Sequence, residues 1–256
     1  MAPLLSCRGL TRRFGGLLAL EALDLEVEEG SVMGLIGPNG SGKTTFFNVL
    51  TGIFPPSAGK ITFAGAPISG LTPQGVYRQG IARTFQRSRL CLPLSIFDNL
   101  MVGNHRHLPH GLWFNLVRRG ALRRKVEESF VQARELLRIF DAALADRLLE
   151  PAGRIAMIDR RRVEVCRALI SRPRLLLLDE PSAGMTHDET ARLMDDILQV
   201  QQQLGLTIIL IEHEMGVIER ITRRCVVLNY GRKIAEGTYA EVSQDASVRQ
   251  AYLGLS

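Results

Sequence analysis

Short apolar runs and amphipathic stretches alternate along most of this chain of 256 residues. Alternating apolar and polar positions predict half-buried strands over 18–27 and 60–63. Uninterrupted apolar runs at 31–36 and 175–178 are typical of strands buried on both faces of a parallel sheet. Between 125 and 140, apolar positions recur with a helical period and charged residues separate them, which predicts an amphipathic helix. The chain is therefore predicted to be α/β.

A glycine-rich segment follows the first buried strand. It fits the pattern G-x-x-x-x-G-K-[ST] without a mismatch and reads Gly37, Pro38, Asn39, Gly40, Ser41, Gly42, Lys43, Thr44. Thr45 begins the predicted helix 45–50, so bound phosphates would lie at a helix N-terminus. The glycines let backbone N–H groups face the phosphates, Lys43 reaches the β- and γ-phosphates, and the Thr44 hydroxyl binds Mg²⁺. The alternative is a glycine-rich turn without a ligand.

Two acidic residues end the apolar run at 175–178. Asp179 and Glu180 would lie at the carboxyl end of a central strand, where α/β sheets bind ligands. Asp179 is expected to hold Mg²⁺ through water, and Glu180 is expected to polarise the attacking water. An acidic pair at one strand end can simply start a loop. Because the phosphate pattern occurs in the same chain, we interpret the protein as one that binds ATP.

The order of elements indicates how the domain is organised. Strands dominate from residue 4 to about 86, and helices dominate from about 87 to 172. Beyond 175 the pattern alternates again, with helices expected at 188–204 and 215–221 and strands at 207–211 and 225–230. This order predicts one nucleotide-binding domain over 1–256 with a helical subdomain, at about 87–172, inserted in its core.

Composition and charge narrow the classes of partner. The net charge is +6, and much of it is concentrated in arginine runs near residues 118, 123 and 160. No aromatic residues interleave with these runs, so solvated helix faces are favoured, with a membrane-proximal face as the alternative, and no nucleic-acid partner is expected. The four cysteines are widely spaced, as in a reduced cytosolic protein. No apolar run is long enough for a membrane span, and no secretion signal opens the chain.

The two phosphate motifs combine with two further polar positions into a family resemblance. Gln86 follows a strand in Thr84-Phe85-Gln86, and His213 follows another in Ile211-Glu212-His213. In order and spacing the full chain resembles the ATP-binding subunits of ABC transporters. Finer features at 80–86, 161–164, 182–185 and 251–254 are similar to the branched-chain amino-acid importer group. The resemblance implies a P-loop NTPase core with an antiparallel β subdomain and an inserted helical subdomain.

The resemblance also implies roles for individual residues. Phe14 would stack on adenine, a contact that tolerates different bases. Gln86 would touch Mg²⁺ or its water and sense the membrane partner, and His213 would contact the γ-phosphate and orient the attacking water. The expected catalytic residues are then Lys43, Glu180 and His213. The expected metal-binding residues are Thr44, Gln86 and Asp179, and ATP would contact Phe14, the loop 37–45 and Gln86.

The family's signature sequence, commonly Leu-Ser-Gly-Gly-Gln, is replaced here by Ile155-Ala156-Met157-Ile158-Asp159. Ala156 lacks the hydroxyl that would contact a γ-phosphate. Ile158 stands where a glycine backbone would approach the phosphate, and its β-branched side chain should obstruct that approach. Asp159 would place a negative charge near the triphosphate. In a head-to-tail pair each ATP lies between one chain's loop and the other chain's signature, so we hypothesise a heterodimer with one active site. Family members that tolerate this variation are the alternative.

The resemblance implies a peripheral subunit on the cytoplasmic side of the inner membrane that hydrolyses ATP to power import of branched-chain or hydrophobic amino acids. Its partners would be permease subunits and a second ATP-binding subunit, and its cofactors ATP and Mg²⁺. Alternatives are an ABC ATPase for another solute, such as urea or lipopolysaccharide, a soluble ABC ATPase of DNA repair or translation, and a subunit that holds ATP without turnover. The intact Lys43, Asp179, Glu180 and His213 argue against the last of these.

Overall fold

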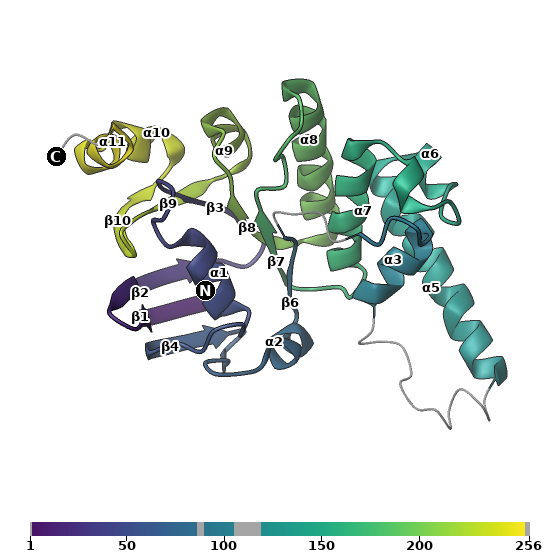
Figure 1. The fold of residues 1–256 in the computed structure, drawn as a ribbon, viewed down its shortest axis with the longest axis horizontal. Coiled ribbons are helices and arrows are strands. Elements are labelled where there is room, and N and C mark those ends of the chain that lie inside the picture. The colour runs from purple at the N-terminus through teal and green to yellow at the C-terminus, as the bar shows by residue number, and fades with distance from the viewer. Residues whose placement is uncertain (1, 86–89, 105–118, 254–256) are drawn as a thin grey trace. The chain divides into compact units, whose positions relative to one another are not determined.

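The computed structural model describes residues 2–85, 90–104 and 119–253 (Figure 1). The chain forms two compact units. The core unit comprises Met1–Arg83, Arg174–Pro181 and Leu204–Ser256, and the helical unit comprises Thr84–Pro173 and Ser182–Gln203. Each unit is therefore assembled from segments that are distant in the sequence.

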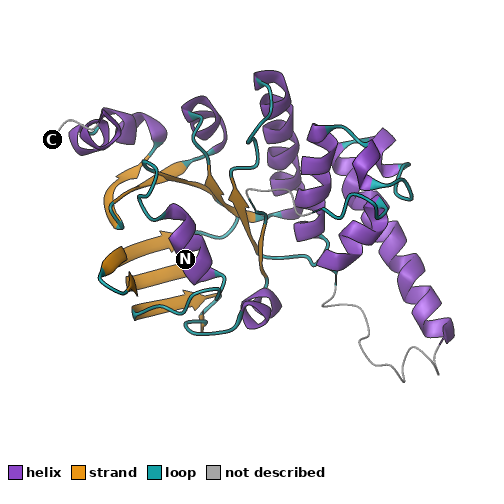
Figure 2. Ribbon diagram, in the orientation of Figure 1, coloured by secondary structure: helices purple, strands orange, loops and turns teal. Residues whose placement is uncertain are grey.

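A six-stranded sheet, drawn among the orange strands of Figure 2, belongs to the core unit. Its strand order is β10-β9-β3-β8-β7-β6, with the labels of Figure 1. Its strands are β3 (Val32–Ile36), β6 (Ile81–Arg83), β7 (Leu175–Asp179), β8 (Thr207–Ile211), β9 (Arg224–Asn229) and β10 (Arg232–Gly237). Neighbouring strands run parallel except for β10, which pairs antiparallel with β9. Every residue of β3, β7 and β8 is buried, which explains their uninterrupted apolar sequences.

A second sheet of the core unit is entirely antiparallel and has the order β2-β1-β4-β5. Its strands are β1 (Leu5–Phe14), β2 (Leu17–Val27), β4 (Ala58–Phe63) and β5 (Ala66–Pro67). Buried and more exposed residues alternate along the second half of β2, as expected for a strand with one face on a core. The sheet brings Phe14, at the end of β1, to the turn that precedes β2.

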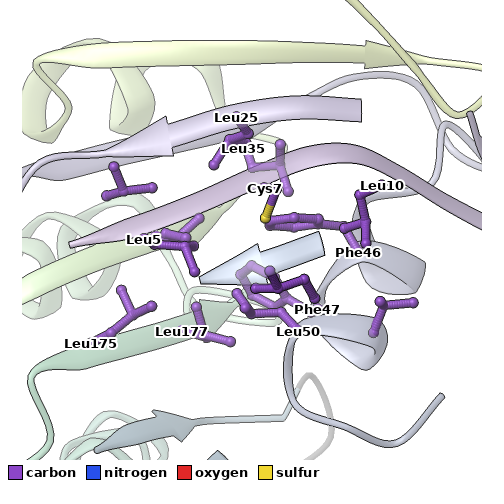
Figure 3. Close-up of a cluster of buried hydrophobic side chains, with 14 of the residues drawn as sticks. Leu5, Cys7, Leu10, Leu25, Leu35, Phe46, Phe47, Leu50, Leu175 and Leu177 are labelled. Carbon is purple, nitrogen blue, oxygen red and sulfur yellow. The ribbon is translucent and has the colours of Figure 1, made fainter. Parts of the chain in front are cut away.

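One apolar cluster joins the two sheets of the core unit (Figure 3). Its members labelled in Figure 3 come from β1 and β2 of the antiparallel sheet, from β3 and β7 of the six-stranded sheet, and from α1 (Lys43–Leu50). Further members come from β4, β6, β8 and β9. Phe46, Phe47 and Leu50 of α1 are fully buried in it. Burial of an aromatic or leucine side chain contributes roughly 1.5–3 kcal/mol, so this cluster fixes the start of α1 against both sheets.

The described part of the core unit also contains the helices α2 (Pro73–Gln79), α9 (Met215–Ile221), α10 (Tyr239–Gln244) and α11 (Ala246–Leu253). Their N-termini show why they begin where they do. The Thr72 side chain accepts a hydrogen bond from the Gly75 N–H, and Pro73 occupies the first turn. Thr238 and Glu241 form a capping box at α10. The sequence pattern did not single out α2, α10, α11 or β10 as elements.

The helical unit contains α3 (Ile96–Gly103), α5 (Arg119–Phe140), α6 (Ala142–Ala145), the 3₁₀ turn η1 (Ala152–Arg154), α7 (Met157–Leu169) and α8 (His187–Leu204, whose last residue belongs to the core unit). Helices α3 and α7 approach closely. A Cβ on Gly103 would lie 1.9 Å from the backbone oxygen of Arg167, so only glycine fits there. Arg162 of α7 also pairs with carboxylates of Asp141, Asp159 and Asp196.

The described elements match most of the predicted ones. The expected helix 125–140 lies within α5, and the expected helix 188–204 matches α8 to within one residue. The strand expected at 225–230 is β9, which begins and ends one residue earlier. Helix α1 begins at Lys43, two residues before the predicted start, because the last glycine of the loop, Gly42, serves as its N-cap.

Candidate functional site

A pocket of about 380 Å³ opens in the core unit around the loop between β3 and α1. It combines loop residues with the ends of β1, β7, β8 and β9. The lining residues are Phe14, Leu17, Leu18, Ala19, Asn39, Gly40, Ser41, Gly42, Lys43, Thr44, Thr45, Glu180, His213, Tyr230 and Gly231. The structure thus brings together most of the residues that the sequence predicted for nucleotide binding.

The loop requires glycine at two of its positions for steric reasons. Gly37 has a φ of 147°, and a Cβ there would lie 2.1 Å from the backbone oxygen of Leu228. Gly42 has a φ of 108°, and its Cβ would lie 2.7 Å from the oxygen of Ala19. These glycines let the loop pass close to neighbouring backbone and turn into α1. Gly37 and Pro38 do not line the pocket but support the residues that do.

Lys43 is the first residue of α1, and its side chain returns over the loop. Its Nζ donates hydrogen bonds to the backbone oxygens of Gly37, at 2.7 Å, and Pro38, at 3.0 Å. Burial lowers the pKa of the Lys43 ammonium, and the nearby carboxylates of Glu180 and Asp179 oppose that shift. The loop thereby holds a positive charge at the N-terminal end of a helix, where the backbone already favours anions.

The Ser41 hydroxyl gives the pocket another polar group. Ser41 is 2% exposed, and within the described part of the chain its Oγ has no hydrogen-bond partner. A buried hydroxyl without a hydrogen-bond partner costs free energy unless a ligand or a water molecule supplies that hydrogen bond. Together with the Lys43 ammonium and the first N–H groups of α1, this hydroxyl forms a donor set that fits a polyphosphate.

Asp179 and Glu180 lie where β7 ends, beside the end of β8. Glu180 donates its backbone N–H to the oxygen of Ile211 at 2.9 Å, and its backbone is left-handed, with a φ of 48°. This conformation is costly for a residue with a Cβ, and the ladder between β7 and β8 holds it. Glu180 Oε1 then lies 2.7 Å from Nε2 of His213, two residues beyond β8. The sequence predicted both residues at this crevice, but not their direct contact.

Arg83 is a site residue that the sequence analysis did not identify. Its Nη2 donates to Asp179 Oδ2 at 2.6 Å, and its Nη1 donates to Asn48 Oδ1 at 2.7 Å. The two charged side chains are 6% and 4% exposed. Asp179 therefore lies beneath the pocket in an ion pair instead of lining it. An arginine that ends a short apolar strand was the only sequence signal, and it does not reveal a partner 96 positions away.

Phe14 lies at the mouth of the pocket and is 36% exposed. Its ring packs edge-on against Phe54, with 5.0 Å between centroids, and the Arg12 guanidinium lies 4.4 Å from its centroid. Leu17 and Tyr230, which the sequence analysis did not consider, line the same pocket and are more exposed than Phe14. This arrangement leaves aromatic and aliphatic surface accessible for a planar ring.

Oxygen-bearing side chains at the site fit a small divalent cation. In the ranges 2–85, 90–104 and 119–253, no three His, Cys, Asp or Glu side chains converge as a metal cage. Mg²⁺ is typically held by one or two protein oxygens together with substrate phosphates. The Thr44 hydroxyl and the Asp179 carboxylate are oxygen ligands of this kind. Gln86, the third predicted ligand, lies outside the described residues.

The segment 155–159, predicted to replace the family signature, lies in the helical unit, where η1 leads into α7. Ile155 is buried, and Ala156 occupies the N-cap position of α7 without a side-chain cap hydrogen bond. Asp159 Oδ1 pairs with Arg162 Nη1 at 3.1 Å. Its negative charge is therefore partly neutralised within the helix, which weakens the repulsion that the sequence alone suggested. Ile158 is the second residue of α7, so its β-branched side chain lies in the first turn of that helix.

No helix among the described residues is long and apolar enough to cross a bilayer.

Comparison with known proteins gives consistent matches along the chain. A model of the ABC transporter family matches residues 20–183, and a model described as branched-chain amino acid ATP-binding cassette transporter matches residues 232–254. The High-affinity branched-chain amino acid transport ATP-binding protein BraF of Pseudomonas aeruginosa is 40% identical over 252 residues and 98% of both chains. The corresponding protein LivG of Escherichia coli K12 is 38% identical over the same coverage.

Solved structures agree with these matches. A nucleotide-free ATP-binding cassette from an ABC transporter superposes with a TM-score of 0.83 at 27% identity, covering 98% of both chains. The ADP conformation of an ATP-binding cassette of an ABC transporter gives 0.84 at 27% identity, covering 99% of this chain and 100% of the other. The predicted fold class and the predicted family resemblance are both confirmed.

Proposed function

The chain belongs to the ABC transporter family of ATP-hydrolysing subunits, and we propose that it powers import of branched-chain amino acids across the cytoplasmic membrane. The observation that carries the proposal is a complete phosphate pocket in a chain that matches BraF and LivG over nearly its full length. The match of residues 232–254 to the branched-chain group adds support from the C-terminal segment. The chain would bind permease subunits from the cytoplasmic side, as one nucleotide-binding domain whose helical unit is the inserted subdomain.

The proposed chemistry assigns one task to each part of the pocket. Phe14 stacks on adenine, while the loop amides, Ser41 and Lys43 hold the phosphates. Thr44 and Asp179, together with Gln86, would hold Mg²⁺, which when bound neutralises charge on the phosphates. Glu180 accepts a hydrogen bond from the attacking water and orients it toward the γ-phosphate. His213, whose Nε2 lies 2.7 Å from Glu180 Oε1, positions that carboxylate and would lie beside the γ-phosphate.

We also propose that the working complex contains a different second ATP-binding subunit. The reason is the segment 155–159, where Ile158 stands at the turn that would face the partner's γ-phosphate and Ala156 offers no hydroxyl. This chain's own pocket contains Lys43, Glu180 and His213, the groups that we propose to be catalytic. A partner with an intact signature would therefore complete one active site, whereas the site facing Ile158 would hold ATP with slow turnover.

Steady-state ATP hydrolysis by the purified chain tests the asymmetry, with Glu180→Gln as the blank. Turnover near the blank that rises in Ile158→Gly supports a defective signature. Turnover of the parent well above the blank contradicts the heterodimer. Uptake of labelled leucine in cells that carry the chain with its permease tests the import function, and Glu180→Gln should abolish it. Uptake that persists in Glu180→Gln would contradict the proposed role.

A further inference from the structure

The Arg83 side chain connects three elements of the core unit beneath the pocket. It lies at the end of β6, which among the described residues is an edge strand of the six-stranded sheet and pairs with β7. Its guanidinium donates to Asp179 of β7 and to Asn48 of α1, and it lies 5.2 Å from the centroid of the Phe47 ring. The side chain is thus held in one orientation by an anion, an amide oxygen and an aromatic face.

The contact with Asp179 is a buried ion pair. Both side chains are almost fully buried, and the N–O distance of 2.6 Å is that of a short charge-assisted hydrogen bond. Removing one partner of such a pair leaves the other charge buried without compensation. The Lys43 ammonium also acts on the Asp179 carboxylate, but Arg83 contacts it directly and therefore helps to fix its position.

A Mg²⁺ ion held through Asp179 would interact with a carboxylate that already forms an ion pair with Arg83. Asp179 Oδ2 accepts a hydrogen bond from Arg83, so Arg83 and the metal would both interact with the same negative charge. A positive group at this distance weakens the attraction of the carboxylate for a second cation. We propose that Arg83 is a positioning residue that holds Asp179 for the metal and, by sharing its charge, lowers the affinity of the site for Mg²⁺. This inference rests on the Mg²⁺-binding role proposed above for Asp179.

A variant that keeps an aliphatic side chain at position 83 but removes the positive charge distinguishes the two functions of Arg83. We expect Arg83→Met to lower the melting temperature in EDTA by about 6–20 °C, because Asp179 stays buried without its partner. In the presence of a non-hydrolysable ATP analogue, the Mg²⁺ concentration that gives half of the thermal stabilisation should fall about tenfold. A purely structural arginine would lower the melting temperature but would not move the Mg²⁺ midpoint.

The matched control is Arg174→Met, which removes an exposed ion pair with Glu29 in the same unit. It should change the melting temperature by only 1–2 °C or so and leave the Mg²⁺ midpoint unchanged. A second comparison sets Arg83→Met/Asp179→Asn against Asp179→Asn alone. Because the carboxylate that pairs with Arg83 is then absent, the loss of Arg83 should lower the melting temperature by less than half of its effect in the parent.

Several results would overturn the inference. An unchanged Mg²⁺ midpoint in Arg83→Met, in a parent that responds to Mg²⁺, would contradict charge sharing while leaving the proposed ATPase function intact. A parent that binds the analogue but shows no response to Mg²⁺ would contradict the metal role of Asp179 and the inference with it. If Arg83→Met does not fold, folding of the double variant supports the pairing, and its failure to fold contradicts it.

Discussion

Alanine at Gly37 and alanine at Gly40 should have very different costs, although both glycines belong to one loop. At Gly37 the added Cβ lies 2.1 Å from the Leu228 oxygen, whereas at Gly40 it meets nothing within 4 Å. Ordinary carbon–oxygen contacts are about 3.3 Å or longer. The Leu228 carbonyl belongs to β9, which lies between β3 and β10, so it has little freedom to move.

The magnitude follows from backbone strain and overpacking. A φ of 147° is almost confined to glycine and costs a side chain about 2 kcal/mol, and forcing apart packed backbone costs about 2 kcal/mol more. Gly37→Ala should therefore lower the free energy of unfolding by about 4 kcal/mol, which corresponds to a fall of about 8–16 °C in melting temperature. Gly40 has a φ of 79°, so Gly40→Ala should lower the free energy of unfolding by only about 1–2 kcal/mol.

Thermal unfolding of the nucleotide-free chain, followed by circular dichroism, measures both variants. Without nucleotide the comparison reports packing alone, because no phosphate contact contributes. Melting temperatures of Gly37→Ala and Gly40→Ala that agree within about 3 °C would refute the steric argument. They would mean that β9 or the loop can move by more than 1 Å at little cost.

Phe14→Ala should weaken ATP binding by about 5- to 150-fold in a fluorescent-nucleotide titration, since stacking contributes roughly 1–3 kcal/mol, whereas Phe14→Trp should preserve it. Burial raises the pKa of the Cys7 thiol to about 12. The unfolded chain therefore loses this proton first as pH rises above 9, and stability should fall between pH 9 and 12 by at most about 4 kcal/mol. In Cys7→Ala this alkaline loss should be smaller, and an unchanged profile would contradict the assignment. Cys91 is exposed and the other three cysteines are buried, so a thiol reagent should label one site rapidly in the native chain and none in Cys91→Ser.

The parts of the site that the sequence predicted are those whose contacts are local or follow from strand direction. The loop 37–44 is contiguous, so its pattern alone specifies glycines, cation and helix start. Glu180 and His213 follow two adjacent parallel strands, whose carboxyl ends must meet at one edge. Their meeting place could therefore be predicted, although the 2.7 Å contact between side chains could not.

Other features depend on packing between distant segments, which a pattern along the chain does not encode. The pairing of Arg83 with Asp179 needs the register of β6 on β7. The position of Arg12 over Phe14 needs Phe54 and the oxygen of Pro55 on the facing segment. Strand β10 was missed because its sequence, RKIAEG, has few apolar residues and none of its residues is buried. Antiparallel pairing with β9 forms it despite this weak signal.

The left-handed backbone of Glu180 has a consequence for how such chains evolve. Asparagine adopts this conformation more easily than glutamate, so Glu180→Asn should relieve part of the strain while it removes the carboxylate that orients water. Natural selection for stability alone would favour that exchange. The carboxylate then persists only in lineages whose fitness depends on turnover. Descendants that keep ATP merely as a bound ligand would be expected to lose it early, and to melt at slightly higher temperature afterwards.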